Sequence, residues 1–125
     1  ILYSVLGTES DIDTKGKILF IEDIDEYLYH IDRMMINLKR NGKLRHLKAL
    51  IVGSFTNIQD NEIPFGSTVE EIVKSHTREY NYPICFDFPS GHIKNNHSII
   101  FGLKICLTIK SNNVILQQTK EPKLT

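Results

Sequence analysis

The stretch ILFIED at residues 18–23 decides the fold, because four apolar residues run without polar alternation directly into two carboxylates. An uninterrupted apolar run of this kind is typical of a strand that is covered on both faces. We therefore predict a strand over Ile18–Ile21 in an α/β domain, with Glu22 and Asp23 at its carboxyl end. In open α/β sheets, ligand groups gather at the carboxyl ends of the strands.

Two amphipathic helices are predicted downstream of this strand. Apolar side chains recur at i, i+4, i+7, i+8 and i+11 across residues 27–38, with Asp25 and Glu26 in the first turn and the Asn41-Gly42 pair as the stop. A second helix is expected to begin at a capping box formed by Ser67 and Glu70.

The remaining strand signals complete a small α/β domain. Apolar runs predict strands over residues 49–52, 84–86, 98–109 (bent at Gly102) and 114–116, with a hairpin turn at 111–113. We therefore expect a partly parallel sheet with two helices and a C-terminal antiparallel hairpin. Residues 120–125 are a polar tail.

The composition excludes several classes of protein. The 125 residues include 15 basic and 15 acidic side chains, a balance that argues against a nucleic-acid platform or a polybasic membrane surface. The longest apolar stretch, Ile99–Ile109, is interrupted by Lys104 and is too short to span a bilayer. The two cysteines, Cys85 and Cys106, lie in apolar runs, so we predict buried free thiols in a reducing compartment.

A second segment that could carry chemistry is the turn FPSGH at residues 88–92. Gly91 permits an unusual backbone angle and Pro89 stiffens the approach to His92. Judged by residue type alone, a carboxylate after a strand, such as Glu22, or a histidine in a turn, such as His92, is more often a solvated loop residue. As a pair, however, a carboxylate can accept the imidazole Nδ1–H, fix the tautomer and stabilise the imidazolium, as in a catalytic triad.

No nucleophile or metal site is marked in the chain. Ser54, Ser90 and Ser98 lie near the ends of predicted strands, but none lies in a G-x-S-x-G elbow. The apolar surroundings expected for both cysteines would blunt their reactivity. Since no H-E-x-x-H, C-x-x-C or Gly-rich phosphate loop occurs either, we predict no metal and no cofactor. We expect the nucleophile to come from sequence outside this chain.

Several motifs, in order along nearly the whole chain, resemble the C-terminal domain of LD-carboxypeptidases, serine peptidases also called muramoyltetrapeptide carboxypeptidases. The resemblance rests on GKILFIED (16–23), YHIDRM (29–34), GKL (42–44), LIVGSF (50–55) and PSGH (89–92). The opening LYSVLGT resembles the segment that joins the two domains of the family. This implies a remnant of that segment at 1–16, the C-terminal domain at 17–119 and the tail at 120–125.

The resemblance implies a function shared between two domains. In the family, the N-terminal domain carries the serine and the oxyanion-hole amides, and a small swivelling α/β C-terminal domain supplies the acid and the base. By motif, Glu22 would be the triad acid and His92 the general base, whereas Asp32 and Arg33 would fix the first helix. The chain alone would then be inactive.

The implied reaction removes the terminal D-alanine from muropeptide tetrapeptides, by hydrolysis of its amide to an L-centre of diaminopimelate or lysine. It would serve cytoplasmic peptidoglycan recycling, without a metal, in a homodimer that has no nucleic-acid or membrane partner. Two alternatives stay open. A related branch hydrolyses peptide-nucleotide antibiotics and confers immunity, and a non-catalytic dimerisation or binding domain could keep the same fold.

Overall fold

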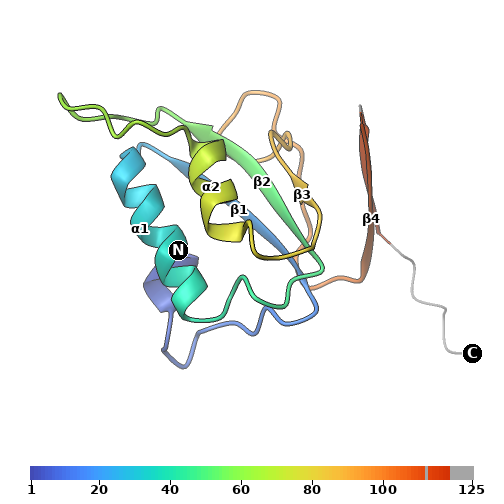
Figure 1. Ribbon diagram of the computed structural model, residues 1–125. Helices are drawn as coiled ribbons and strands as arrows, with labels where there is room; N and C mark the ends of the chain where they lie inside the picture. Colours follow the sequence, from blue (N-terminus) through green and yellow to red (C-terminus); the bar gives the residue numbers. More distant parts are fainter. Residues whose placement is uncertain (112, 119–125) are drawn as a thin grey trace, which may run out of the picture.

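The computed structural model describes residues 1–111 and 113–118 of the chain. A three-stranded parallel sheet has the order β1-β2-β3, and a separate two-stranded antiparallel sheet pairs β4 with β5 (Figure 1). The elements in chain order are the 3-10 helix η1 (Leu2–Val5), β1 (Ile18–Ile24), α1 (Leu28–Arg40), β2 (Ala49–Thr56), α2 (Val69–Thr77), β3 (Ile84–Cys85), β4 (Ile105–Lys110) and β5 (Asn113–Gln118). The predicted α/β class, with two helices, a parallel sheet and a C-terminal hairpin, is confirmed.

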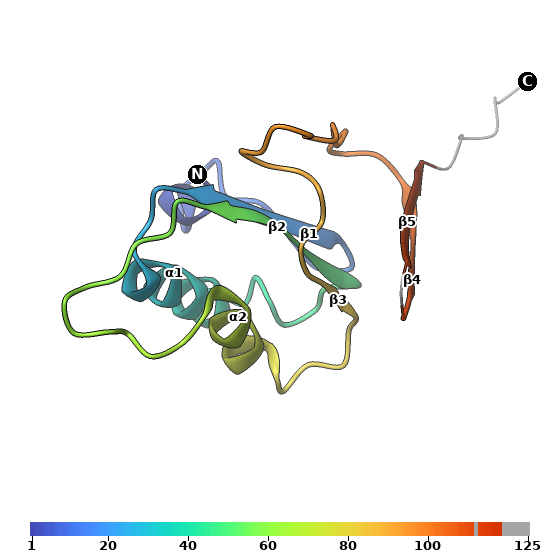
Figure 2. The same cartoon turned by 90° about the horizontal axis from the view of Figure 1, so that it is seen from above.

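The core lies between the sheet and the two helices, which cover the same face of the sheet (Figure 2). From α1, Ile31, Met35 and Leu38 are buried at i, i+4 and i+7, as the apolar stripe predicts. Leu50 in the central strand β2 is fully buried against them. Burying each such side chain stabilises the fold by about 1.5–3 kcal/mol. The segment between β3 and β4 passes over the opposite face of the sheet (Figure 2).

The first helix begins later than predicted. Asp25 and Glu26 precede it and Tyr27 is its N-cap residue, so its first turn contains no acidic side chain. The reason is a pairing with a distant segment: Gln59 accepts a hydrogen bond from Leu28 N–H and donates one to the carbonyl of Glu26, which keeps the chain extended.

The end of α1 agrees with the sequence. Gly42 has φ +72° and its N–H binds the carbonyl of Lys39, while Lys43 N–H binds the carbonyl of Leu38. These two bonds form a Schellman motif, which satisfies carbonyls at the end of the helix.

The capping box of α2 lies one residue further along than predicted. The side chain of Thr68, not Ser67, accepts from Glu71 N–H at 3.2 Å, and Glu71 Oε2 accepts from Thr68 N–H at 2.8 Å. Glu70, the partner expected from spacing, instead pairs with Lys74. The sequence STVEE contains two overlapping boxes, so the spacing alone could not choose between them.

The strand limits also differ from the prediction. β1 continues to Ile24, which pairs with Thr56, so Glu22 and Asp23 lie inside the strand and not after it. Leu19 is the one buried residue of β1, so the strand is not covered on both faces throughout.

The strand predicted over residues 98–109 is mostly irregular, and only β4 (Ile105–Lys110) is extended. Its first half exposes Ile100, Phe101 and Leu103, and Gly102 adopts φ +80°, which interrupts a strand. The hairpin itself is confirmed by the register of β4 and β5, although Asn112 in its turn and the tail 120–125 lie outside the described residues.

The cysteines differ from one another. Cys85 in β3 is buried, as predicted, but Cys106 in β4 is exposed. The prediction for Cys106 was wrong because, among the described strands, β4 pairs with β5 alone, so the apolar run around Cys106 is not enclosed by a second layer. Within the described part of the chain, no helix combines the length and the apolar character needed to cross a bilayer.

Candidate active site

Glu22 and His92 meet in the structure, although they are 70 residues apart in the chain. His92 Nδ1 lies 2.8 Å from Glu22 Oε2, so in the neutral ring Nδ1–H donates to the carboxylate. Glu22 comes from β1 and His92 from the loop after β3. The side chain of His92 is 53% exposed, and Nε2 forms no hydrogen bond with any residue that the structure describes. The outer nitrogen of the ring is therefore accessible to a reacting group.

A β-bulge shapes β2 opposite Glu22. Ile21 pairs with Val52 and Asp23 with Phe55, so Gly53 and Ser54 together face the single residue Glu22. The extra residue in β2 lies where the loop after β3 approaches the sheet, since Ser54 N–H binds the carbonyl of Ser90 at 2.9 Å. Bulges of this kind redirect side chains near functional sites.

Two glycines allow the loop to lie against the strand. Gly91 has φ +128°, and a Cβ there would be 2.2 Å from Ser54 Oγ and 3.0 Å from Glu22 Oε2. A Cβ at Gly53 would be 2.5 Å from the carbonyl oxygen of Ser90. Because real Cβ atoms do not approach other atoms so closely, both positions require glycine for this packing.

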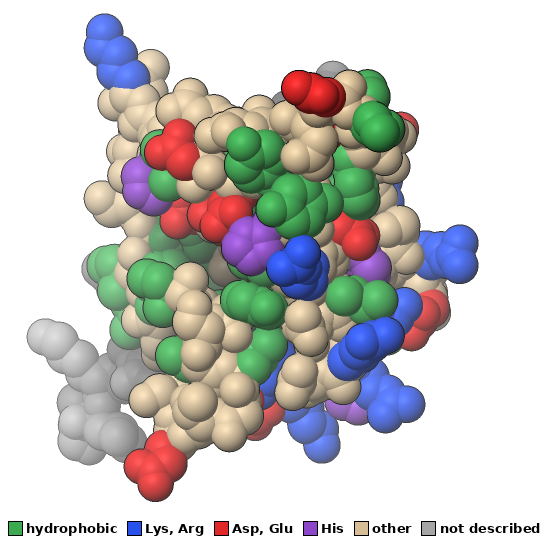
Figure 3. All heavy atoms as spheres, turned by 90° about the vertical axis from the view of Figure 1, so that its left-hand side faces the viewer, with side chains coloured by type: hydrophobic (Ala, Val, Ile, Leu, Met, Phe, Trp, Pro, Cys, Tyr) green, Lys and Arg blue, Asp and Glu red, His purple; other side chains and the backbone are tan. Residues whose placement is uncertain are grey.

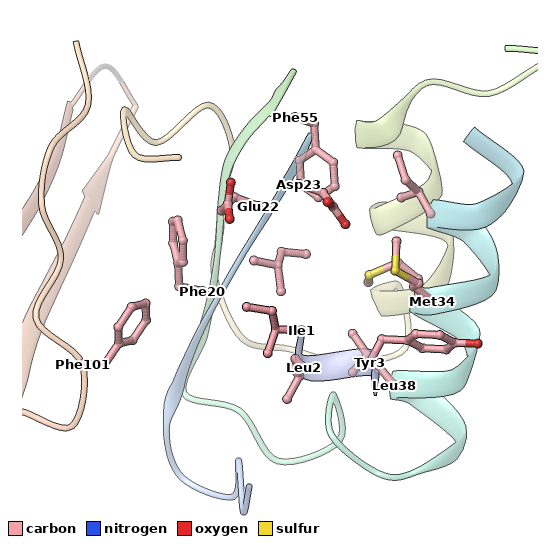
Figure 4. A pocket seen from close by; sticks show the side chains of 13 residues that line it. Ile1, Leu2, Tyr3, Phe20, Glu22, Asp23, Met34, Leu38, Phe55 and Phe101 are labelled. Atoms are coloured by element: carbon pink, nitrogen blue, oxygen red, sulfur yellow. The ribbon is translucent and has the colours of Figure 1, made fainter. Parts of the chain in front are cut away.

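Asp23 is not part of the Glu22–His92 pair. Its carboxylate accepts a local hydrogen bond from Ile24 N–H at 2.9 Å. Figure 4 shows the side chains of Glu22 and Asp23 on different sides of β1, as expected for neighbours in a strand. Of the two carboxylates at the end of the apolar run, only Glu22 contacts His92.

An apolar pocket of about 440 Å³ lies along the outer edge of β1, next to the pair. Glu22 and Asp23 are the acidic groups in its lining, and the rest comes from Ile1, η1, α1, β1, β2 and Phe101 (Figure 4). On the face seen in Figure 3, hydrophobic side chains lie beside acidic, histidine and basic side chains. The pocket gives Glu22 a partly apolar environment, in which 27% of its side chain remains exposed.

The other candidates have different roles. Ser54 Oγ lies 3.3 Å from the carbonyl oxygen of Ser90, Ser90 itself is buried, and Ser98 is exposed. Within residues 1–111 and 113–118, no serine hydroxyl forms a hydrogen bond with His92. Asp32 binds His76 Nε2 at 2.7 Å and so joins α1 to α2.

Two further pairs lie in or next to α1. Arg33 stacks over the Tyr29 ring at 5.3 Å, and His30 Nδ1 lies 2.5 Å from Oε2 of Glu26, which precedes the helix. In the described ranges, no three His, Cys, Asp or Glu side chains are grouped closely enough to hold a metal ion.

Three residues bind the loop that carries His92, a role that the sequence analysis assigned to none of them. Thr56 Oγ1 donates to the carbonyl of His92 at 3.1 Å, Ser54 N–H binds Ser90, and Asn96 Oδ1 accepts from Gly91 N–H at 3.0 Å. The available signal was that Ser54 and Thr56 are polar residues at the carboxyl end of an apolar strand, where ligand groups gather.

Comparison with known proteins gives a consistent assignment. The family model described as the LD-carboxypeptidase C-terminal domain matches residues 1–107. A probable murein peptide carboxypeptidase of Bacillus subtilis is 32% identical over 117 residues, which cover 94% of this chain and 37% of that protein. The murein tetrapeptide carboxypeptidase of Pseudomonas aeruginosa is 30% identical over 87 residues, or 70% of this chain and 28% of that protein.

Solved structures show the same fold. The muramoyltetrapeptide carboxypeptidase from Oxalobacter formigenes superposes with a TM-score of 0.84 at 28% identity, covering 97% of this chain and 42% of that one. The microcin C7 self-immunity protein MccF has a TM-score of 0.61 at 21% identity over 70% of this chain and 26% of its own, a likeness of fold alone.

The chain spans about a third of the length of these curated relatives, 37% of the Bacillus subtilis protein and 28% of the Pseudomonas aeruginosa protein. The matched part is the one that contains β1, the bulged β2 and the loop with His92. The chain therefore belongs to the LD-carboxypeptidase family and corresponds to its C-terminal domain.

Proposed function

We propose that this chain supplies the acid–base half of a serine-type LD-carboxypeptidase, with His92 as general base and Glu22 as the triad acid. The observation that carries this proposal is the 2.8 Å contact between His92 Nδ1 and Glu22 Oε2, which leaves Nε2 accessible. In a Ser-His-acid triad, the acid binds Nδ1–H and the opposite ring nitrogen exchanges protons with the serine. The serine would come from the N-terminal domain of the whole protein.

The chemistry then follows in two steps. His92 Nε2 takes the serine proton as Oγ attacks the amide carbonyl, and Glu22 stabilises the imidazolium. The C–N bond breaks as His92 returns the proton to the leaving amine, which departs as D-alanine. Water, activated by the same nitrogen, hydrolyses the resulting acyl-enzyme.

The substrate we propose is a muropeptide tetrapeptide, cleaved at the amide that joins the L-centre of its third residue to the terminal D-alanine. The names of the relatives support this class, since they include a murein peptide and a murein tetrapeptide carboxypeptidase. We further propose that the whole protein acts in cytoplasmic peptidoglycan recycling as a homodimer. Light scattering of the full-length protein tests the dimer.

The first experiment measures D-alanine release from a muropeptide tetrapeptide by the full-length protein. Glu22→Gln and His92→Ala should each lower kcat/KM by about 10³-fold or more, because a triad member is lost. Glu26→Gln is the matched control, since it breaks the other Glu–His pair, the local contact with His30, and should leave the rate nearly unchanged. Near-normal release by Glu22→Gln or His92→Ala contradicts the proposal.

The same proteins distinguish the two alternatives. Hydrolysis of a peptide-nucleotide antibiotic without muropeptide cleavage, lost in both variants, would assign the pair to the immunity branch. No turnover of either substrate by the full-length wild type would favour a non-catalytic binding or dimerisation domain.

A further inference from the structure

The loop that carries His92 is held to β2 at two peptide groups, the one that precedes Gly91 and the one that follows His92. Ser54 N–H donates to the carbonyl of Ser90 at 2.9 Å, and Thr56 Oγ1 donates to the carbonyl of His92 at 3.1 Å. Ser54 and Thr56 are two apart in a strand, so they lie on the same side of the β2 backbone. The carboxyl end of β2 therefore fixes the chain just before Gly91 and just after His92.

A third contact comes from the loop itself. Gly91 N–H donates to Asn96 Oδ1 at 3.0 Å, and the next residue, His97, donates its N–H to the carbonyl of Pro89 at 2.8 Å. Only the carbonyl oxygen of an asparagine side chain can accept a hydrogen bond, so this contact also sets the orientation of the amide.

The ring of His92 has little else to orient it. Its side chain is 53% exposed, and among the described residues its side chain forms a hydrogen bond with Glu22 Oε2. A half-exposed side chain is not fixed by packing, so its direction depends on the backbone that carries it and on hydrogen bonds around it. The peptide groups just before Gly91 and just after His92 are the parts of that backbone that these hydrogen bonds hold.

We propose that Thr56 and Asn96 are positioning residues for His92: by holding the carbonyl of His92 and the N–H of Gly91, they direct Nδ1 towards Glu22 and leave Nε2 outward. The catalytic importance of this arrangement rests on the proposed function. The orientation itself does not, because it is a property of the ring and can be measured without a substrate.

The ring tautomer provides that measurement. In the full-length protein labelled with ¹⁵N-histidine, the ring ¹⁵N shifts at about pH 8, where an imidazole is ordinarily neutral, show which nitrogen carries the proton. The wild type should show a single tautomer with Nδ1–H, since Glu22 accepts that proton. His92→Gln identifies the signals by their loss.

The test variants remove one contact each. Thr56→Val is nearly isosteric but lacks the donor, and Asn96→Ala removes the acceptor from an exposed side chain, so it should not impair folding. Each should give mixed tautomers and lower kcat about threefold to tenfold with KM unchanged, the loss expected for one hydrogen bond. Thr56→Ser keeps the hydroxyl and should show the wild-type tautomer and kcat. Thr108→Val in β4 is the control, which should change neither.

Three results would overturn the proposal. The first is an unchanged Nδ1–H tautomer in both Thr56→Val and Asn96→Ala, and the second is a lower kcat with an unaltered ring. The third is mixed tautomers at an unchanged kcat in an active protein. If the wild type releases no D-alanine at all, the proposed function fails, and the tautomer alone still decides whether Thr56 and Asn96 orient His92.

Discussion

Gly91 lies so close to Ser54 that a Cβ atom at position 91 would be 2.2 Å from the Ser54 hydroxyl oxygen. The same atom would be 3.0 Å from Glu22 Oε2, the oxygen that contacts His92. The absence of a side chain at position 91 is thus what allows the loop to approach β2 and Glu22 together. The packing of one residue controls whether the carboxylate and the imidazole meet.

Gly91→Ala should separate Glu22 from His92 and destabilise the protein. The backbone at φ +128° is sparsely populated by residues with a Cβ, which costs about 1–3 kcal/mol, and the contact with Ser54 adds to this cost. Urea unfolding measures the stability, and the ring ¹⁵N shifts of His92 should show loss of the single Nδ1–H tautomer.

Gly66→Ala is the matched control for this substitution. Gly66 also has a positive φ, +82°, but a Cβ there would meet nothing within 4 Å. It should therefore cost only the left-handed backbone strain, about 1–2 kcal/mol, and leave the His92 tautomer unchanged. Equal losses of stability in the two variants would contradict the role of the Ser54 contact.

The position of the capping box can be tested with two neighbouring residues. Thr68→Ala should lower the free energy of unfolding by about 1 kcal/mol, because it removes the acceptor for Glu71 N–H. Ser67→Ala should change it by less than about 0.5 kcal/mol, as is usual for a surface substitution. A larger loss of stability in Ser67→Ala than in Thr68→Ala, by thermal or urea unfolding, would show that the capping box lies at Ser67.

The same box predicts a pH dependence. Hydrogen bonds from the backbone N–H and the hydroxyl of Thr68 hold the pKa of Glu71 below its usual value. A carboxyl whose folded pKa is depressed stabilises the protein above its unfolded pKa, and this stabilisation is lost as the pH falls through the folded pKa. The urea midpoint of Glu71→Gln should therefore lie below that of the wild type at neutral pH and approach it in acid. A difference that grows in acid would contradict this sign.

The two thiols should react at very different rates. Burial raises the pKa of the Cys85 thiol, and its side chain is only 5% exposed, whereas Cys106 is exposed. Because the thiolate is the reactive form, a thiol reagent should modify Cys106 quickly in the native protein and Cys85 only after unfolding. In Cys106→Ser the fast phase should disappear. Two equal rates in the native wild type would show that Cys85 is not buried.

Local patterns in the sequence were enough for the architecture. The uninterrupted apolar runs predicted the cores of β1, β2 and β3, and the apolar stripe predicted the buried face of α1. Both depend on the period with which side chains repeat along one segment, which neighbours in the sequence specify. The motifs around Glu22 and His92 likewise identified the family.

The tertiary structure decided what depends on contacts between distant segments. The pairing of Gln59 with Glu26 and Leu28 made α1 begin later in the chain than predicted. The lack of a covering layer left Cys106 exposed, and the bulge in β2 placed Ser54 against Gly91. The sequence by itself thus determined which residues are candidates for the site. Only the folded chain decided that Glu22 Oε2 reaches His92 Nδ1 and that Thr56 and Asn96 hold the loop, because these bonds join residues whose proximity no local period encodes.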